Sequence, residues 1–157
     1  MSMDELTVLL DKQAIKEVTD LFSTLDDEKA VAEQMKLLTD DAEITAYMGD
    51  SLYSSMRGKA DIESTFTRLL GDFDGVYHLN GQLTLNRLTR DEAEGMLYCH
   101  VVLVEKQNDK TIIHNNYGRY EDSYVKRDGR WLLRALPPLP PPAVNRRGRP
   151  PSEAGRT

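Results

Sequence analysis

The sequence predicts an α+β domain in which helices grouped near the N-terminus cover a mostly antiparallel sheet. In the N-terminal part, apolar residues recur at three- and four-residue intervals, which is typical of amphipathic helices. In the C-terminal half, β-branched and aromatic residues alternate with polar ones between short polar turns, which is typical of strands. The longest such stretch, Lys110–Leu133, contains Asp128-Gly129, a pair that favours a tight hairpin turn.

Three helices are expected, over residues 4–25, 31–38 and 58–71. The first has charged residues between its apolar positions and stops near Asp26-Asp27. The second is shorter and is broken by Thr39-Asp40-Asp41, and the third begins at Gly58–Asp61 and ends at Gly71. These helices place most of their apolar residues on one stripe, so each needs a sheet or another helix to cover it.

Strands are expected over residues 42–48, 77–88, 94–106, 110–127 and 130–136, with a weak strand or loop near Leu52-Tyr53. The later strands are joined by short turns and should pair with their neighbours in order, as a meander. A strongly twisted sheet around one long helix leaves a conical pocket between them. We therefore expect a cone-shaped α+β barrel, with three N-terminal helices on a strongly curved sheet that encloses a pocket.

Charge and proline divide the 157 residues into two parts. All seven prolines lie in residues 137–157, which also hold four arginines and one glutamate. The net charge of −6 is thus +3 in this tail and −9 in residues 1–136. We expect one acidic globular domain over residues 1–136, whose charge disfavours nucleic-acid binding, and a Pro/Arg-rich C-terminal tail over residues 137–157.

The tail allows more than one interpretation. Pro137–Pro142 could present a polyproline helix to an SH3-like groove, and Arg146–Pro150 is similar to a minor-groove hook. Both motifs are short and arise by chance in such a composition. A disordered tail, or one that packs on a neighbouring subunit, is the simpler alternative.

Several function classes have no support in the sequence. There is no Gly-rich phosphate loop, no G-x-S-x-G elbow and no metal-spaced Cys/His cluster, so nucleotide hydrolysis, serine hydrolysis and structural zinc have no support. The acid–base chemistry considered below requires neither a metal nor an organic cofactor, and we expect none. No apolar run approaches the ~20 residues that span a bilayer, and the acidic start is unlike a secretory leader. The single cysteine, Cys99, sits among strand residues and suits a buried position. We expect a cytoplasmic protein that does not associate with membranes.

Candidate acid–base residues are the three histidines and an acid near a helix end. Acid–base chemistry needs a group that titrates near neutrality beside one that fixes its tautomer and stabilises its charged form. His78 opens a strand, and Asp26 lies where the first helix ends. From the residues alone, His78 could equally be a surface or core residue and Asp26 a helix-end acid. His114 lies near a turn, which favours solvent or an interface.

Other polar residues could line the pocket. His100 and Asn116 lie within strands, where every second residue faces the same side, and we list both as candidate substrate-binding residues. The sequence does not reveal which parity faces inward.

Four segments in this order resemble the SnoaL-like branch of the nuclear transport factor 2-like superfamily. They are LLDKQAIKEVTDLFSTLDD, LLTDDAEITAY with RGKADIESTF, YHLNGQLTL, and GRYEDSYVKRDGRWLL. The resemblance covers about residues 4–136. Relatives include polyketide cyclases, ketosteroid isomerase, scytalone dehydratase, bile-acid 7α-dehydratase and hexachlorocyclohexane dehydrochlorinase. It implies a cofactor-independent enzyme for a small apolar, aromatic or steroid-like molecule, and a homodimer or homotrimer.

The resemblance also implies roles for single residues. In dehydratase-like members, an aspartate at the end of the first helix pairs with a histidine at the start of a strand, and the matching positions are Asp26 and His78. Tyr47 matches a tyrosine that binds a substrate oxygen, although a core-packing role is equally open. Leu21 stands where the bile-acid dehydratase resemblance places a tyrosine. A hydroxyl that could protonate a leaving group is missing there, which favours proton abstraction or simple binding.

The sequence thus predicts a lyase- or isomerase-type enzyme, in which a His78–Asp26 dyad abstracts a proton from a carbon next to an activating group. The rival hypothesis is a noncatalytic ligand-binding or oligomerisation domain of the same fold, because a fold does not determine a function.

Overall fold

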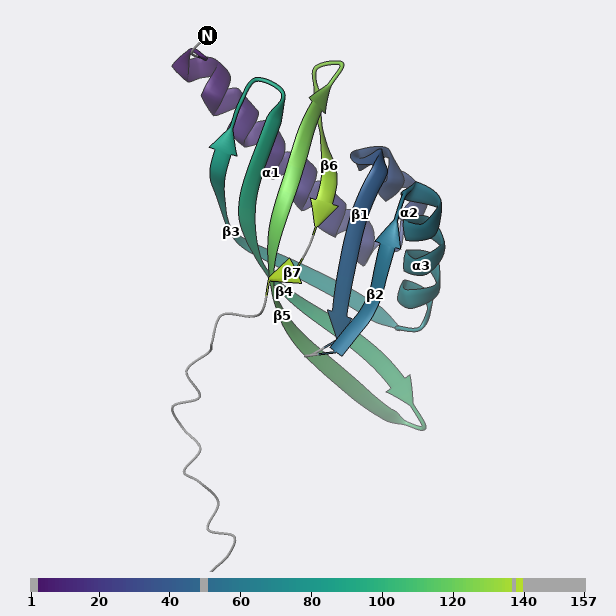
Figure 1. Cartoon of the computed structure of the whole chain (residues 1–157). Coiled ribbons are helices and arrows are strands. Elements are labelled where there is room, and N and C mark those ends of the chain that lie inside the picture. The colour runs from purple at the N-terminus through teal and green to yellow at the C-terminus, as the bar shows by residue number, and fades with distance from the viewer. Residues whose placement is uncertain (1–2, 49–50, 137, 140–157) are drawn as a thin grey trace, which may run out of the picture.

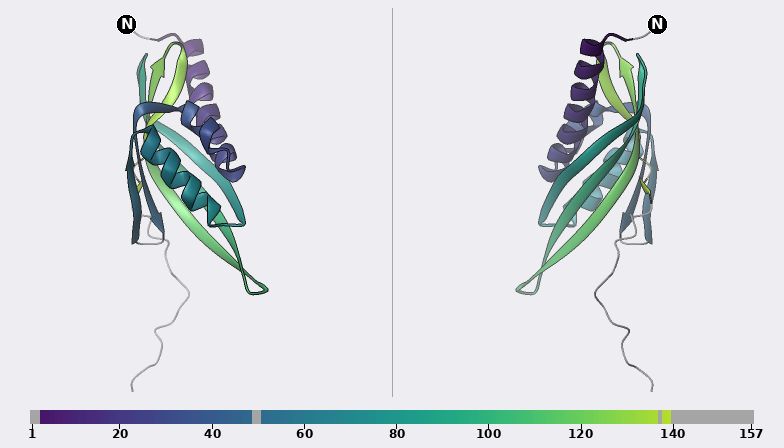
Figure 2. Two further views of the ribbon diagram at one scale, coloured as in Figure 1. Left: turned by 90° about the vertical axis from the view of Figure 1, so that its right-hand side faces the viewer. Right: turned by 90° about the vertical axis from the view of Figure 1, so that its left-hand side faces the viewer.

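The computed structural model describes residues 3–48, 51–136 and 138–139. Three helices pack on one open, strongly curved sheet, as Figures 1 and 2 show. The helices are α1 (Glu5–Asp27), α2 (Val31–Gln34), which continues as a short 3₁₀ turn over Met35–Leu37, and α3 (Lys59–Gly71). The expected α+β class and helix-on-sheet architecture are confirmed, with a sheet that does not close into a complete barrel.

The strands are β1 (Leu38–Met48), β2 (Ser51–Arg57), β3 (Gly75–Leu88), β4 (Glu92–Gln107), β5 (Lys110–Arg127), β6 (Arg130–Leu136) and β7 (Pro138–Leu139). Their order in the sheet is β2-β1-β6-β5-β4-β3, with β7 paired to β5. The strands β3 to β6 form the expected antiparallel meander. The pairing of β1 with β6 is parallel, which makes the sheet mixed.

The long helix α1 begins and ends with well-defined caps. At its start, the Asp4 side chain accepts the main-chain N–H of Thr7 at 2.8 Å. At its end, Lys29 adopts a left-handed backbone with φ 57°, its N–H binds the carbonyl of Asp26, and the N–H of Ala30 binds that of Leu25. This is the Schellman arrangement, which fixes the direction of the last turn. The last turn therefore presents Asp26 and Asp27 in defined positions.

A buried acid ties α1 to the far strands of the sheet. Asp11 is 4% exposed, and its Oδ1 accepts from Trp131 Nε1 at 2.9 Å and from Lys126 Nζ at 2.7 Å. A buried carboxylate is tolerated when it is paired and hydrogen-bonded in this way. The surrounding core is apolar, and its fully buried members include Ile15, Leu38 and Leu133. The helix thus lies firmly along β6 and β3, as the views in Figure 2 show.

Irregular pairing helps the sheet to curve around the helices. The register between β3 and β4 shifts after Asn80, that between β5 and β6 shifts after Ser123, and that between β1 and β2 shifts after Ala46. An extra residue in one strand bends it and increases its twist. The sheet consequently wraps around α1 and α3 and leaves a hollow between them.

Two turns use the left-handed backbone that a tight hairpin needs. Asp128 and Gly129 have φ values of 51° and 75°, as the sequence pattern predicts. Asn108 and Asp109, at 46° and 64°, make the same kind of turn between β4 and β5. Both turns are short, so the register of each strand pair is set at the turn.

The structure adds detail to two of the expected elements. The second helix ends before Thr39-Asp40-Asp41 as expected, and these residues belong to β1; of the strand or loop expected near Leu52-Tyr53, the structure has the strand, β2. Thr39 is buried while Asp40 and Asp41 are exposed, so the aspartates occupy solvent-facing strand positions rather than a loop.

The expected tail over residues 137–157 lies largely outside the described residues. Its Pro138–Leu139 forms β7, which pairs with Arg119 and Tyr120 of β5. The domain boundary at Leu136 stays a prediction.

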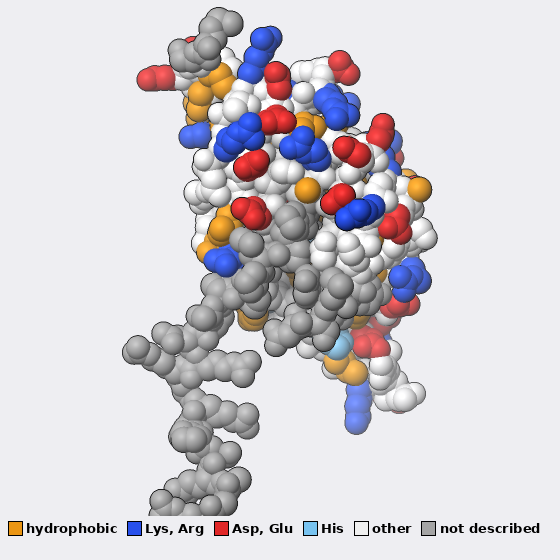
Figure 3. All heavy atoms as spheres, in the orientation of Figure 1, with side chains coloured by type: hydrophobic (Ala, Val, Ile, Leu, Met, Phe, Trp, Pro, Cys, Tyr) orange, Lys and Arg blue, Asp and Glu red, His pale blue; other side chains and the backbone are white. Residues whose placement is uncertain are grey.

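The surface seen in Figure 3 carries charges of both signs side by side. Among the described residues, opposite charges meet in ion pairs such as Arg87 with Glu92 and Glu94, and Arg134 with Glu92. Acidic and basic side chains are interspersed on this face rather than gathered by sign.

Candidate acid–base site

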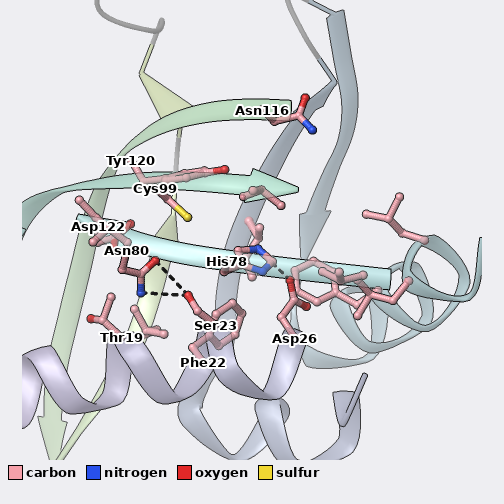
Figure 4. A pocket seen from close by; sticks show the side chains of 18 of the residues that line it. Thr19, Phe22, Ser23, Asp26, His78, Asn80, Cys99, Asn116, Tyr120 and Asp122 are labelled. Atoms are coloured by element: carbon pink, nitrogen blue, oxygen red, sulfur yellow. Dashed lines mark hydrogen bonds and ion pairs between the residues drawn. The ribbon is translucent and has the colours of Figure 1, made fainter. Parts of the chain in front are cut away.

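A cavity of about 160 Å³ lies between the helices and the curved sheet. Most of its wall is apolar and comes from α1, α3, β1, β3, β4 and β6. Polar side chains line it in a few places: Thr19, Ser23, Asp26, Thr45, His78, Asn80, Asn116, Tyr120 and Asp122. Figure 4 shows most of them, with α1 below and β3, β4 and β5 above. A mostly apolar hollow with a few polar groups is typical of small-molecule sites.

His78 lies between two aspartates from the last turn of α1. Its Nε2 is 3.2 Å from Asp26 Oδ2, and its Nδ1 is 2.7 Å from Asp27 Oδ1. The other oxygen of Asp27 accepts the main-chain N–H of His78 at 3.1 Å. The His78 side chain is only 15% exposed. Each ring nitrogen therefore faces a carboxyl group, and Figure 4 shows the Asp26 side of this contact.

Asp26 is the more buried of the two acids. Burial raises its pKa, and the charge of His78 and a hydrogen bond from Gln34 oppose that shift. Gln34, which is fully buried, donates through Nε2 to Asp26 Oδ1 at 3.0 Å and to the carbonyl of Phe22 at 3.0 Å. Since Gln34 donates to Oδ1, Oδ2 is the oxygen of Asp26 that faces His78.

A second polar group lies further along α1 and β3. Asn80 and Ser23 hydrogen-bond to each other at 3.0–3.2 Å, and Asn80 Nδ2 also donates to Asp20 at 3.1 Å. Asn80 is two residues from His78 in β3 and therefore faces the same side. These contacts hold β3 against α1 next to His78 and Asp26 (Figure 4).

A third acid, Asp122, lines the cavity from β5. It is 1% exposed, its Oδ2 accepts from Tyr124 Oη at 3.0 Å, and its Oδ1 has no hydrogen-bond partner among the described residues. Burial raises its pKa to about 7. Tyr124 in turn lies 3.0 Å from Thr19 Oγ1. The acid is therefore held by neutral groups only, within the part of the chain that the structure describes.

Two other ionisable side chains in the wall are kept neutral by burial. Burial raises the pKa of Cys99 to about 12, with the charges of Asp27 and Asp26 adding to the effect. Burial likewise raises the pKa of Tyr120 to about 12, with smaller contributions from Cys99, Asp122 and Asp26. Cys99 therefore acts as a small apolar wall residue, in agreement with the buried position expected for it.

The sequence-predicted residues do not all meet in the cavity. His78, Asp26 and Asn116 line it. His100 does not, and that expectation is corrected: on β4 the residues Leu97, Cys99 and Val101 face the cavity, so alternation turns His100 to the outer face. There His100 stacks on Tyr117 and contacts Asn115 at 3.1 Å.

Three other positions complete the comparison. The side chain of Tyr47 lies outside the described residues, although its backbone belongs to β1. Leu21 is 46% exposed and does not line the cavity, so this position offers no wall contact. His114 contacts Glu105 at 3.2 Å and packs edge-on against Phe73, away from the cavity lining.

Sequence reasoning missed Asp27, Gln34 and Asp122. Asp27 could have been found as the acid adjacent to Asp26, but its role depends on where α1 ends. Gln34 and Asp122 carry no motif of their own, and only the packing reveals that each is buried beside a cavity residue.

The chain belongs to the SnoaL-like domain family, whose model matches residues 7–136. A search of the curated proteins finds no match. Among solved structures, a provisionally assigned scytalone dehydratase from Novosphingobium aromaticivorans DSM 12444 is 22% identical, covers 85% of this chain and 87% of its own, and has a TM-score of 0.71.

Dehydrochlorinases of the same fold are also similar to this chain. Hexachlorocyclohexane dehydrochlorinase LinA-type3 from Novosphingobium barchaimii LL02 is 17% identical, with 87% of this chain and 94% of that chain covered and a TM-score of 0.70. A type 2 LinA is 18% identical, with 95% and 99% covered and a TM-score of 0.73. At these identities the likeness establishes the fold, and with the family it supports a small-molecule lyase or isomerase type of function.

None of the described helices is long and apolar enough to cross a membrane. The cytoplasmic location expected from the sequence stays a prediction.

Proposed function

We propose that this protein is a cofactor-independent lyase or isomerase that removes a proton from carbon in a small organic substrate. The observation that carries the proposal is the contact of His78 Nε2 with Asp26 at 3.2 Å inside a mostly apolar cavity. The names of the similar structures, a scytalone dehydratase and hexachlorocyclohexane dehydrochlorinases, are consistent with such chemistry.

In the proposed reaction, the lone pair of His78 Nε2 accepts the proton from the substrate carbon. The electrons of the broken C–H bond then form a carbon–carbon double bond while a leaving group on the neighbouring carbon departs with its own bonding electrons, or they move onto an adjacent carbonyl to give an enolate. The protonated imidazole is stabilised by the Asp26 carboxylate. Gln34 holds Asp26 in place through a hydrogen bond at 3.0 Å, so the pair keeps its geometry during the transfer.

The size of the cavity suggests the class of substrate. An engineered apolar cavity of about 150 Å³ binds benzene, and this cavity measures about 160 Å³. A molecule of one or two rings suits this space better than the steroid-like molecule that the resemblance also allowed. Asn116 and Tyr120 would offer hydrogen bonds to an oxygen or halogen substituent.

The proposal is tested with a probe that requires only a base. The C3–H of 5-nitrobenzisoxazole is removed by a base while its N–O bond breaks, which releases a coloured phenolate. We expect the wild-type protein to accelerate this reaction, and His78→Ala to lower the rate by roughly 10²–10⁴-fold, the usual contribution of a general base. His114→Ala, a histidine outside the cavity lining, is the matched control.

A second assay follows chloride release from γ-hexachlorocyclohexane. Equal rates for wild type and His78→Ala with both probes would contradict the proposal and favour the noncatalytic ligand-binding domain. The same experiments on Asp26→Asn separate a missing base from a missing stabilising charge.

We also propose that the outer face of the sheet binds a second copy of this chain. Tyr77, Leu79, Ile113 and Tyr117 are each more than half exposed on β3 and β5, and His100 lies between them on β4. Such an apolar face supports self-association. Sedimentation should give a dimer or trimer for the wild type and a monomer for Leu79→Lys, and a monomeric wild type would contradict this proposal.

A further inference from the structure

The geometry points to Asp27 as a positioning residue that fixes the tautomer of His78 from outside the cavity. Its catalytic consequence rests on the proposed function, whereas the tautomer itself can be measured on the protein alone. The family resemblance did not assign this role to Asp27, because it implied only Asp26 as the partner of the histidine.

Asp27 holds His78 at two points. The main-chain N–H of His78 can only donate, so Asp27 Oδ2 accepts it at 3.1 Å. The same carboxylate places Oδ1 2.7 Å from ring Nδ1. A carboxylate faces each ring nitrogen, but the contact to Asp27 is the shorter, at 2.7 Å against 3.2 Å to Asp26, so a ring with a single hydrogen carries it on Nδ1 and donates to Asp27. In the neutral imidazole, the lone pair is then on Nε2, the nitrogen that faces Asp26.

The position of Asp27 separates it from the substrate. Asp26 and His78 line the cavity, and Asp27 does not. Consecutive residues of a helix project about 100° apart. The two aspartates therefore approach the ring from different sides, one within the cavity and one behind it. The Schellman arrangement at Lys29 and Ala30 fixes the helix end that carries both.

Removal of Asp27 should change which nitrogen carries hydrogen. Asp26 would then be the carboxylate left beside the ring, and it faces Nε2. A neutral ring with hydrogen on Nε2 donates to Asp26 and offers no lone pair to the substrate. The base would be lost although His78 and Asp26 are both present. A wrong tautomer of this kind is costly in other histidine-dependent enzymes, by about 10⁴-fold in the serine protease triad.

The direct test is ¹⁵N NMR of the imidazole nitrogens, with the signals of His78 identified by their absence from His78→Gln. At the pH where titration shows a neutral ring, we expect a protonated-type Nδ1 and a lone-pair-type Nε2 in the wild type. Asp27→Ala should shift the ring toward the opposite pattern. Asp27→Asn retains an acceptor oxygen and should restore the wild-type tautomer, which also covers the case in which the alanine variant fails to fold.

Glu28→Gln is the matched control. It removes one negative charge from the neighbouring, exposed residue and should leave the tautomer unchanged. A wild-type neutral ring with hydrogen on Nε2, or the same spectrum in wild type and Asp27→Ala, would overturn the inference.

Kinetics with 5-nitrobenzisoxazole distinguish the two proposals. Asp27→Ala should lower kcat by roughly 10²–10⁴-fold while KM changes little, because Asp27 does not touch the substrate. Asp27→Asn should recover much of kcat. If His78→Ala has no effect on the rate but the tautomer behaves as expected, the proposed function fails and the positioning role of Asp27 stands. If His78→Ala is inactive and Asp27→Ala retains both rate and tautomer, the reverse holds.

Discussion

Asp26 and Asp122 both line the cavity, and they differ in the groups beside them. Asp26 faces the imidazole of His78 and accepts a hydrogen bond from Gln34. Asp122 accepts one hydrogen bond from Tyr124, and its other oxygen has no partner among the described residues. Burial raises the pKa of both acids. Asp122 is thus a buried acid without a charged partner, whereas Asp26 is buried beside an imidazole, which is the arrangement that the proposed proton transfer requires.

The largest expected effect separates the two acids by activity. Asp26→Asn removes the charge that stabilises protonated His78, and we expect the rate with 5-nitrobenzisoxazole to fall roughly 10²–10⁴-fold. Asp122→Asn leaves His78 and both of its carboxylate partners in place, so its rate should stay within a few fold of wild type. Equal losses for the two variants, measured in parallel, would remove the distinction between the acids.

The second prediction concerns the pH dependence of stability that Asp122 causes. The pKa of Asp122 is about 7 in the folded protein, above the ordinary value of 3.8. Because the folded state binds this proton more tightly, stability should decline as the pH rises from about 4 to about 7. Below pH 4 the acid is neutral in both states, and above pH 7 the full cost of its charge is present.

Asp122→Asn cannot titrate, so it should gain stability relative to wild type across this range, by on the order of a few kcal/mol. Urea unfolding of both proteins at pH 4.5 and pH 8 measures the change. The pKa of Asp26 affects both proteins alike and cancels in the difference. A constant difference between the two pH values would contradict the neutral state of Asp122.

A third prediction compares the groups that support each acid. Gln34→Leu removes the hydrogen bonds to Asp26 and to the carbonyl of Phe22, and should lower the free energy of unfolding by about 1–3 kcal/mol. It should also raise the pKa of Asp26, because the Gln34 hydrogen bond lowers it. The acidic limb of the pH–rate profile should then move to higher pH.

Thr19→Val is the matched change in the other group, since Thr19 contacts Tyr124 at 3.0 Å. It should lower stability by a similar amount and leave the pH–rate profile where it is. A shift of the profile in Thr19→Val, or its absence in Gln34→Leu, would show that the two groups are not independent.

The smallest effect concerns the helix end that presents both aspartates. Lys29 has a φ of 57°, a conformation that costs a side chain about 1 kcal/mol relative to glycine. Lys29→Gly should relieve this strain but lose the contact of Lys29 Nζ with the carbonyl of Phe73. We expect the free energy of unfolding, measured by thermal unfolding, to change by no more than about 1 kcal/mol, and we expect activity to be retained. A large loss of activity would mean that Lys29 itself supports the site.

The sequence predicted the parts of the fold that depend on local patterns. Helix α1, the long β4–β5–β6 meander and the turn at Asp128-Gly129 all follow from periodicity or from backbone preference. The parallel pairing of β1 with β6 was not predicted, because it joins strands that are far apart in the chain.

The candidate site could be predicted only in part from the sequence. The approach of Asp26 to His78 was expected from the family resemblance, but the approach of Asp27 depends on the last residue of α1, which periodicity does not fix to within one position. His100 was a candidate lining residue that the structure places on the outer face; because both faces of β4 carry apolar residues, alternation alone did not reveal which side is inward.

The origin of the cavity wall bears on how proteins of this kind can acquire new substrates. The proposed proton-transfer residues come from α1 and β3, whereas much of the apolar lining comes from β4, α3 and β1. A substitution at Leu97 or Leu69 would change which molecule fits without touching His78, Asp26 or Asp27. On the proposed function, substrate range can therefore diverge in evolution by single substitutions in the wall while the proposed base is preserved.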